Sequence, residues 1–180
     1  SCNTNYLSKF NFDGQRIWST YFKLLNNVKA AENSVYVTSS FNQPSLITSG
    51  TFQQNSDISS VFLGKFNDLG QPIWGTHIGL NGGFTSGNGT GLKVEIDNLE
   101  NVYLFGGTKC TTNIATSDGF LTANPSTNYG AGYVMKFNPN GQRLWGTYYG
   151  DSQNTIILSL KTTGDFFYIS GTTNCEENIA

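Results

Sequence analysis

Short hydrophobic runs alternate along the whole chain with clusters of Gly, Asn, Asp, Ser and Thr. Runs of this length, rich in Val, Ile, Tyr and Phe, are typical of β-strands, and the polar clusters between them are typical of turns. One block, Lys-Phe-Asn-x-x-Gly-Gln-x-Ile/Leu-Trp-x-Thr, occurs three times, beginning at Lys9, Lys65 and Lys136. This recurrence indicates an internally repeated all-β protein.

The recurring block predicts a β-hairpin. In the first copy, residues 6–10 and 16–22 read as extended strands, and residues 11–14 supply the reversal. The Gly of the block provides a positive φ and the Asn side chain caps the turn. The turn glycines are therefore expected at Gly14, Gly70 and Gly141.

A second strand motif lies downstream of each hairpin, at residues 35–38, 102–108 and 166–172. A turn precedes each motif, and a further short strand precedes that turn, so each repeat is expected to hold four strands in meander order. Adjacent bulky residues such as Ile17 and Trp18 point to opposite faces of a strand, which suits sheets that are covered on both sides. The residues expected in the blade core are Trp18, Trp74, Trp145, Tyr36, Tyr103 and Phe167.

These features predict a β-propeller segment of three four-stranded antiparallel blades that form part of a ring. The blade repeats are placed at residues 1–58, 59–130 and 131–180, with the third truncated in its connector. The connector itself recurs, at residues 46–52 and 114–120. We expect a piece of a longer chain, or a short protein whose copies complete a ring together.

Composition narrows the possible partners. Only 12% of the residues are charged and the formal net charge is −2, with a pI near 5.2, so there is no basic patch for nucleic acid. No apolar run is long enough for a membrane span, and a secretion signal, if the protein is exported, lies upstream or has been removed. The partners that remain are further blades of the same chain, a second copy, a surface glycan or another protein.

The repeats resemble the SBBP β-propeller repeat, named for a seven-bladed propeller and found in exported and surface proteins of bacteria. The resemblance rests on the Lys-Phe-Asn-x-x-Gly hairpin, the Trp-x-Thr-Tyr strand, the Val-Tyr-Val/Leu strand, the Gly-Thr-Thr exit and the Ile-Ala-Thr-Ser connector. His77 departs from it by replacing the Tyr of the second strand. The resemblance implies a secreted or cell-surface location in Bacteroidetes, with type IX secretion, and implies no particular catalytic chemistry.

Catalytic or metal-binding groups are sparse. His77 is the single histidine, and we interpret it as a packing substitution rather than a ligand or base. Glu95 and Asp97 are two apart on a predicted strand and could act as paired carboxylates, but neither occurs in the other repeats. No calcium loop and no phosphate loop is present. We therefore expect no catalytic residues, no metal and no cofactor, and we do not expect an enzyme.

Binding, if it occurs, is expected in the variable loops, at residues 79–91 and 111–129. The tryptophans could stack on sugars, but blade core is the preferred interpretation. The candidate ligand-binding residues are Asn81, Phe84, Asn88, Thr111, Asn113, Asn128 and Tyr129. The resulting hypothesis is a non-enzymatic surface scaffold for adhesion or interaction; a purely structural segment, or a propeller domain of a secreted enzyme with its catalytic residues elsewhere, are the alternatives.

The chain has three cysteines, Cys2, Cys110 and Cys175. The last two occupy nearly equivalent positions in successive repeats, which lie far apart in a propeller, so a disulfide between them is not expected. The sequence leaves open how the three cysteines are paired.

Overall fold

The computed structural model describes residues 4–40, 43–56, 60–79, 83 and 92–175, and in these residues the protein is all-β with antiparallel sheets. The described part contains a single short 3₁₀ turn, η1 (Pro44–Leu46), and no α-helix, so no helix in it could cross a membrane. The strands are β1 (Asn5–Phe10), β2 (Arg16–Phe22), β3 (Leu25–Ala30), β4 (Ser34–Ser39), β5 (Val61–Asn67), β6 (Pro72–Ile78), β7 (Lys93–Ile96), β8 (Val102–Thr108), β9 (Ala131–Phe137), β10 (Arg143–Tyr149), β11 (Thr155–Thr163) and β12 (Phe166–Thr173).

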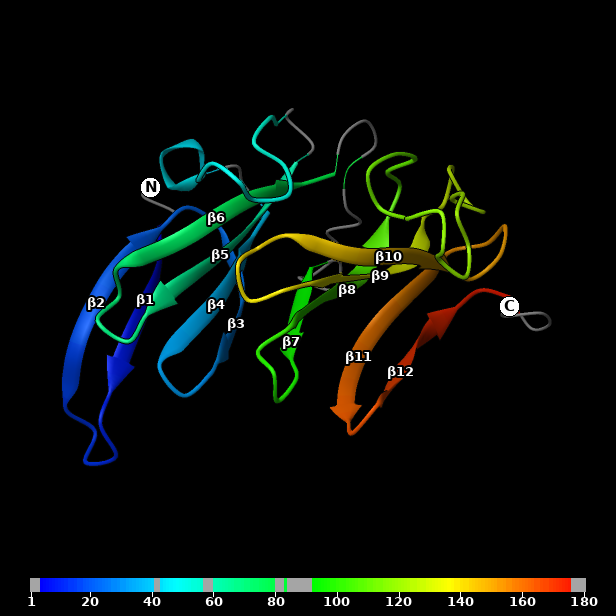
Figure 1. The fold of residues 1–180 in the computed structure, drawn as a ribbon. Helices are drawn as coiled ribbons and strands as arrows, with labels where there is room; N and C mark the ends of the chain where they lie inside the picture. Colours follow the sequence, from blue (N-terminus) through cyan, green and yellow to red (C-terminus); the bar gives the residue numbers. More distant parts are fainter. Residues whose placement is uncertain (1–3, 41–42, 57–59, 80–82, 84–91, 176–180) are drawn as a thin grey trace.

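The strands form two four-stranded sheets flanked by two two-stranded sheets. The orders are β1-β2, β3-β4-β5-β6, β7-β8-β9-β10 and β11-β12. The four sheets lie side by side, with β1-β2 at one end of the molecule and β11-β12 at the other (Figure 1). The described residues therefore do not close a ring.

The prediction of three four-stranded blades, one for each sequence repeat, was wrong. Strands β3 and β4 come from the first repeat, but they pair with the hairpin β5-β6 of the second repeat; β7 and β8 likewise pair with the hairpin β9-β10 of the third. The physical reason is that β2 does not turn back onto β3. The short link at Lys23 and Leu24 carries the chain from one sheet to the next, with Leu24 at a φ of 54°.

Hydrophobic side chains fill the spaces between neighbouring sheets. Leu7 and Phe22 of the β1-β2 sheet pack with Phe62 of the next sheet, and a larger cluster joins that sheet to β7-β10. A third cluster lies between β7-β10 and β11-β12. The middle strands β5 and β8 are buried on both faces. On the outermost strands, in contrast, about half of the side chain is exposed at Ile17, Ile73 and Leu144.

The expected core residues divide according to position. Tyr36, Trp74 and Tyr103, in the two complete sheets, are buried. Trp18 and Trp145 are half-buried, and Phe167 is 37% exposed. Phe167 differs from the expectation because β12 has no neighbouring strand on its outer side among the described residues.

All three recurring blocks form the same hairpin turn. In each, the Asn Oδ1 accepts a hydrogen bond from the Gln backbone N–H at 2.8–3.0 Å, and the Asn Nδ2 donates to the Gln Oε1 at 2.9 Å. Gly14, Gly70 and Gly141 all have a φ of 78°. The Asn-x-x-Gly-Gln pattern is thus explained by a paired side-chain clamp across a turn that needs a left-handed residue.

Candidate functional site

The long connectors after β4 and β8 lie on one side of the sheets, opposite the turns β3-β4, β7-β8 and β11-β12 (Figure 1). Both connectors dock on an outermost strand in the same way. Thr48 N–H donates to the Gly75 carbonyl at 3.1 Å, and Thr116 N–H donates to the Gly146 carbonyl at 2.9 Å. The recurring Thr of the connector therefore anchors it to the sheet.

The sequence-predicted ligand-binding residues are only partly described. Asn81, Phe84 and Asn88 lie outside the described residues. The other four, which are exposed, belong to the connector between β8 and β9, and no hydrogen bond joins them to one another in the described part of the chain: Thr111, Asn113, Asn128 and Tyr129. The structure does not bring these residues together into one site.

A polar groove lies on the other side of the molecule, between the β7-β8 turn and the β11-β12 turn. Its volume is about 330 Å³, and it is lined on one side by Asp97, Tyr103 and Lys136. Thr162 and Asp165 contribute to the opposite wall. Carboxylates, an ammonium group, hydroxyls and amides thus converge around one open space.

The charged groups of the polar groove are held in place. Asp97 Oδ2 accepts hydrogen bonds from Asn101 Nδ2 at 2.9 Å and from the Tyr103 hydroxyl at 3.3 Å, and lies 3.5 Å from Lys136 Nζ. Lys136 Nζ also lies 5.0 Å from the centroid of the Tyr103 ring, within cation–π range. Burial opposes the ionisation of Asp97, but its hydrogen bonds and Lys136 outweigh burial and lower its pKa. The groove therefore presents a fixed ion pair near neutral pH.

In the preceding sheet, a glutamate fills the position that corresponds to the polar groove. Lys65 lies over the Tyr36 ring as Lys136 lies over Tyr103, but here Glu100, from the adjacent sheet, accepts a hydrogen bond from Lys65 Nζ at 2.8 Å. Glu100 stands two residues before β8, at a φ of 58°. Gly164 stands two residues before β12, at a φ of 53°, and has no side chain to reach Lys136. This Glu-to-Gly difference explains why the polar groove is open.

Glu95 and Asp97 do not form a carboxylate pair. Glu95 is buried and forms ion pairs with Lys29 of the preceding sheet and Lys161 of the following sheet, whereas Asp97 binds its own turn and Lys136. Burial opposes ionisation of Glu95, but the hydrogen bonds from the two lysines lower its pKa. Glu95 therefore links three sheets electrostatically.

His77 is buried, and its Nδ1 lies 3.2 Å from the Gln54 carbonyl. Burial lowers its pKa, although the Gln54 hydrogen bond opposes the shift. In the described part of the chain, no three His, Cys, Asp or Glu side chains are grouped to hold a metal ion, and no disulfide joins Cys110 to Cys175.

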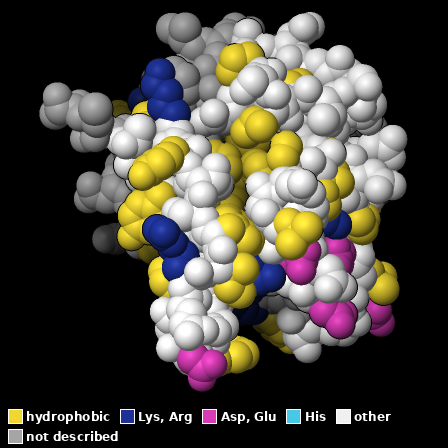
Figure 2. All heavy atoms as spheres, turned by 90° about the vertical axis from the view of Figure 1, so that its left-hand side faces the viewer, with side chains coloured by type: hydrophobic (Ala, Val, Ile, Leu, Met, Phe, Trp, Pro, Cys, Tyr) yellow, Lys and Arg dark blue, Asp and Glu magenta, His cyan; other side chains and the backbone are white. Residues whose placement is uncertain are grey.

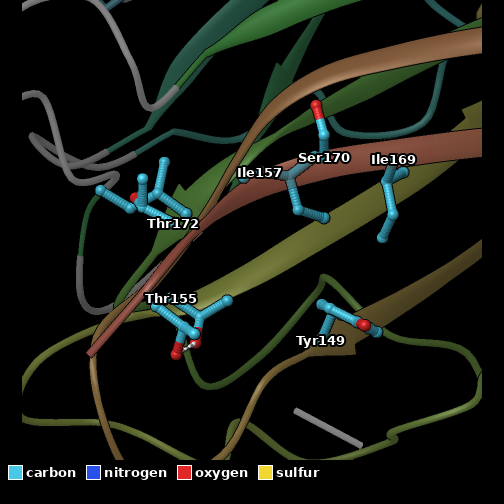
Figure 3. Close-up of a pocket in the computed structure, with 9 residues that line it drawn as sticks. Tyr149, Thr155, Ile157, Ile169, Ser170 and Thr172 are labelled. Carbon is cyan, nitrogen blue, oxygen red and sulfur yellow. Dashed lines mark hydrogen bonds between the residues drawn. The ribbon is translucent and has the colours of Figure 1, made fainter. Parts of the chain in front are cut away.

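A second groove, of about 200 Å³, follows β12 (Figure 3). Tyr149 lies at one side of it, and Thr155, Ile157, Ile169, Ser170 and Thr172 are among the residues that line it. This β12 groove contains no ionisable group besides Tyr149. Its lining differs from that of the polar groove, because it follows consecutive residues of β12, from Ile169 to Thr173.

No family model matches the chain, and no curated protein matches it. The polar groove was not predicted from the sequence. The sequence singles out Asp97 only as a neighbour of Glu95. The signal that could have found the groove is the replacement of Glu100 by Gly164 at corresponding turns.

Proposed function

We propose that this protein is a non-enzymatic, secreted or cell-surface scaffold of the β-propeller class, related to the SBBP repeat, that binds a glycan. The observation that carries the proposal is the polar groove, in which Asp97, Tyr103 and Lys136 present fixed donors and acceptors. Exposed Leu99 and Phe166, 72% and 71% exposed, lie at its rim. An apolar surface beside convergent polar groups suits a sugar, which offers hydroxyls at its edge and C–H groups on its face.

The exposed connector residues lie on the opposite side of the sheets from the polar groove and are proposed as separate contacts. Thr111, Asn113, Asn128 and Tyr129 remain proposed contacts for a glycan or for a protein. A bacterial, exported location accounts for the low charge and the Asn- and Thr-rich surface. A purely structural role in a larger exported protein is the second candidate, and the two-stranded sheets at both ends of the described chain favour it.

The test uses an array of neutral gluco-, manno- and galacto-oligosaccharides, followed by calorimetry with any sugar that binds. Gly164→Glu adds a carboxylate beside Lys136, as Glu100 does beside Lys65, and a Cβ at Gly164 meets no atom within 4 Å. We expect the substitution to weaken binding at least about tenfold, or ~1.4 kcal/mol.

Gly50→Glu is the matched control, because Gly50 also has a positive φ and open space around it but lies on the connector after β4, on the opposite side of the sheets. It should leave sugar binding unchanged. The glycan proposal fails if no oligosaccharide binds the folded chain, or if Gly164→Glu binds as well as the original.

A further inference from the structure

One contact between sheets is made twice within the chain. The Trp18 indole Nε1 donates to the Asp68 carbonyl at 2.8 Å, and its ring covers Gly70, where an added Cβ would lie 3.1 Å from the ring. Trp74 repeats the arrangement one sheet later: its Nε1 donates to the Pro139 carbonyl at 2.8 Å and its ring covers Gly141. In both cases the Trp of one hairpin docks on the turn of the next hairpin.

The chain also contains the two partners of a third such contact, a Trp and a hairpin turn, but these two do not contact each other. Trp145 occupies the corresponding position on β10, is half-buried, and stacks on Phe167 at 5.8 Å; within the described residues its indole N–H has no hydrogen-bond acceptor. Gly14, the corresponding turn glycine of the first hairpin, has no atom within 4 Å of an added Cβ. Among the described residues, Trp145 thus docks on no hairpin turn, and the turn at Gly14 is covered by no Trp.

The strand edges show the same complementarity. β4 pairs with β5 and β8 pairs with β9, but β12 pairs only with β11 among the described strands. β1, which corresponds to β5 and β9, pairs only with β2 in the part of the chain that the structure describes. Both edges expose aromatic side chains, Tyr168 at 67% on β12 and Tyr6 at 67% on β1.

The β12 groove marks the place of the missing strand. Ile78 corresponds to Tyr149 and belongs to the same core cluster as Ala131 and Tyr133 of β9. One sheet earlier, β9 therefore fills the space that corresponds to the β12 groove. Hydrophobic side chains also lie across the face at the β1-β2 end of the molecule (Figure 2). Exposed apolar surface bordering an unpaired strand is a favourable site for strand addition.

We propose that the β12 edge binds the β1-β2 hairpin of a second copy of this chain. The two ends lie at opposite sides of one molecule, so a chain does not pair with itself in this structure (Figure 1). The register follows from Tyr36↔Lys65 and Tyr103↔Lys136, which place Phe167 opposite Lys9, and Tyr168 opposite Ser8, of the second copy. Trp145 then donates its indole N–H to the Phe12 carbonyl, the position of Asp68 and Pro139.

This contact completes a four-stranded sheet, β11-β12-β1-β2, from two copies. The contact is head-to-tail, and such contacts build a ring when the rotation closes and an open assembly when it does not. The inference does not require glycan binding, because the assembly can form without any sugar.

The first experiment measures the mass of the full 180-residue chain by light scattering at increasing concentration. We expect concentration-dependent association, weakened about five- to tenfold by Trp145→Phe, which removes one hydrogen-bond donor. Trp74→Phe is the matched control: it removes the same bond inside one chain, so it should lower the melting temperature and leave association unchanged.

Cross-linking tests the register separately. In chains carrying Cys2→Ser, Cys110→Ala and Cys175→Ser, a Ser8→Cys chain mixed with a Tyr168→Cys chain should form a disulfide-linked pair on mild oxidation. A Ser8→Cys chain mixed with a Thr172→Cys chain should not, because those positions are four residues out of register.

A chain that stays monomeric up to about 100 μM overturns the proposal, since a weaker contact would lie outside the usual range of specific pairing. A monomer that binds a synthetic peptide of residues 5–22 also overturns it, and points instead to a hairpin supplied by another protein. Association with equal cross-linking of both cysteine pairs rejects the proposed register.

Discussion

Gly146→Ala tests whether the connector between β8 and β9 is fixed to the sheet. A Cβ at Gly146 would lie 2.0 Å from the Ile114 carbonyl oxygen, which is backbone and cannot rotate away. The connector must then move, and the bonds between Thr116 and Gly146, at 2.9 and 3.1 Å, are lost with it. Two hydrogen bonds at about 1 kcal/mol each and an overpacking cost of about 1 kcal/mol or more give about 3 kcal/mol.

For a chain of this size, a loss of about 3 kcal/mol lowers the melting temperature by roughly 6–12 °C. Thermal and urea unfolding followed by circular dichroism measure the change. Gly50→Ala is the control, because its Cβ meets open space and its φ of 82° carries only the left-handed cost of about 1–2 kcal/mol. A Gly146→Ala chain no less stable than Gly50→Ala would show that the connector is not docked as described.

Three further substitutions test the buried polar groups. Because the pKa of Glu95 is below its ordinary value of 4.5, the stability it contributes is complete above that pH and is lost as the pH falls through the lowered pKa; Glu95→Gln should flatten the fall in unfolding free energy below about pH 5. His77 also has a lowered pKa, so its contribution is present above 6.5 and lost on acidification, and His77→Gln should reduce the loss of melting temperature between about pH 7 and pH 5. Tyr148→Phe removes a buried hydroxyl whose pKa burial raises to about 12 and which bonds the Cys110 carbonyl at 2.9 Å; urea unfolding should show a loss of about 1 kcal/mol, since Asn124 still donates to that carbonyl.

The local features of the fold could be predicted because their causes are local. The Asn67 and Gln71 clamp lies within five consecutive residues, and Gly70 provides the left-handed position that the turn requires. The strand content could likewise be predicted from the composition and from the length of the hydrophobic runs. Such features depend on a few neighbouring side chains, which the sequence lists in order.

The grouping of strands into sheets could not be predicted from those neighbours. Loop length suggested that the long connector after β4 separates two blades and that the short link after β2 joins two strands of one blade. The structure has the reverse, because the long connector returns antiparallel to its own sheet and docks there through Thr48. Pairing of β4 with β5 depends on contacts between residues far apart in the chain, such as Tyr36 and Lys65.

The polar groove was missed for a related reason. Asp97 follows β7 and Lys136 lies on β9 of the same sheet, but Thr162 and Asp165 come from the next sheet, and only the packing of the two sheets brings them together. Each four-stranded sheet combines the last two strands of one sequence repeat with the hairpin of the next repeat. This offset also determines which turn faces which lysine. In the predicted blades Glu100 and Gly164 already occupy corresponding turns, but only the observed sheets place each turn opposite a lysine of the neighbouring sheet.

The polar groove and the proposed contact between copies meet at Lys136. In the first sheet, the corresponding Lys9 donates to the Asp68 carbonyl at 3.1 Å, the same oxygen that accepts from Trp18. A second copy would therefore place its Phe12 carbonyl between Trp145 and Lys136 and complete one wall of the groove. Sugar binding and association would then be linked, and by reciprocity each would strengthen the other by the same factor. A sugar affinity that rises with protein concentration would show this coupling, whereas an affinity independent of concentration would separate the two sites.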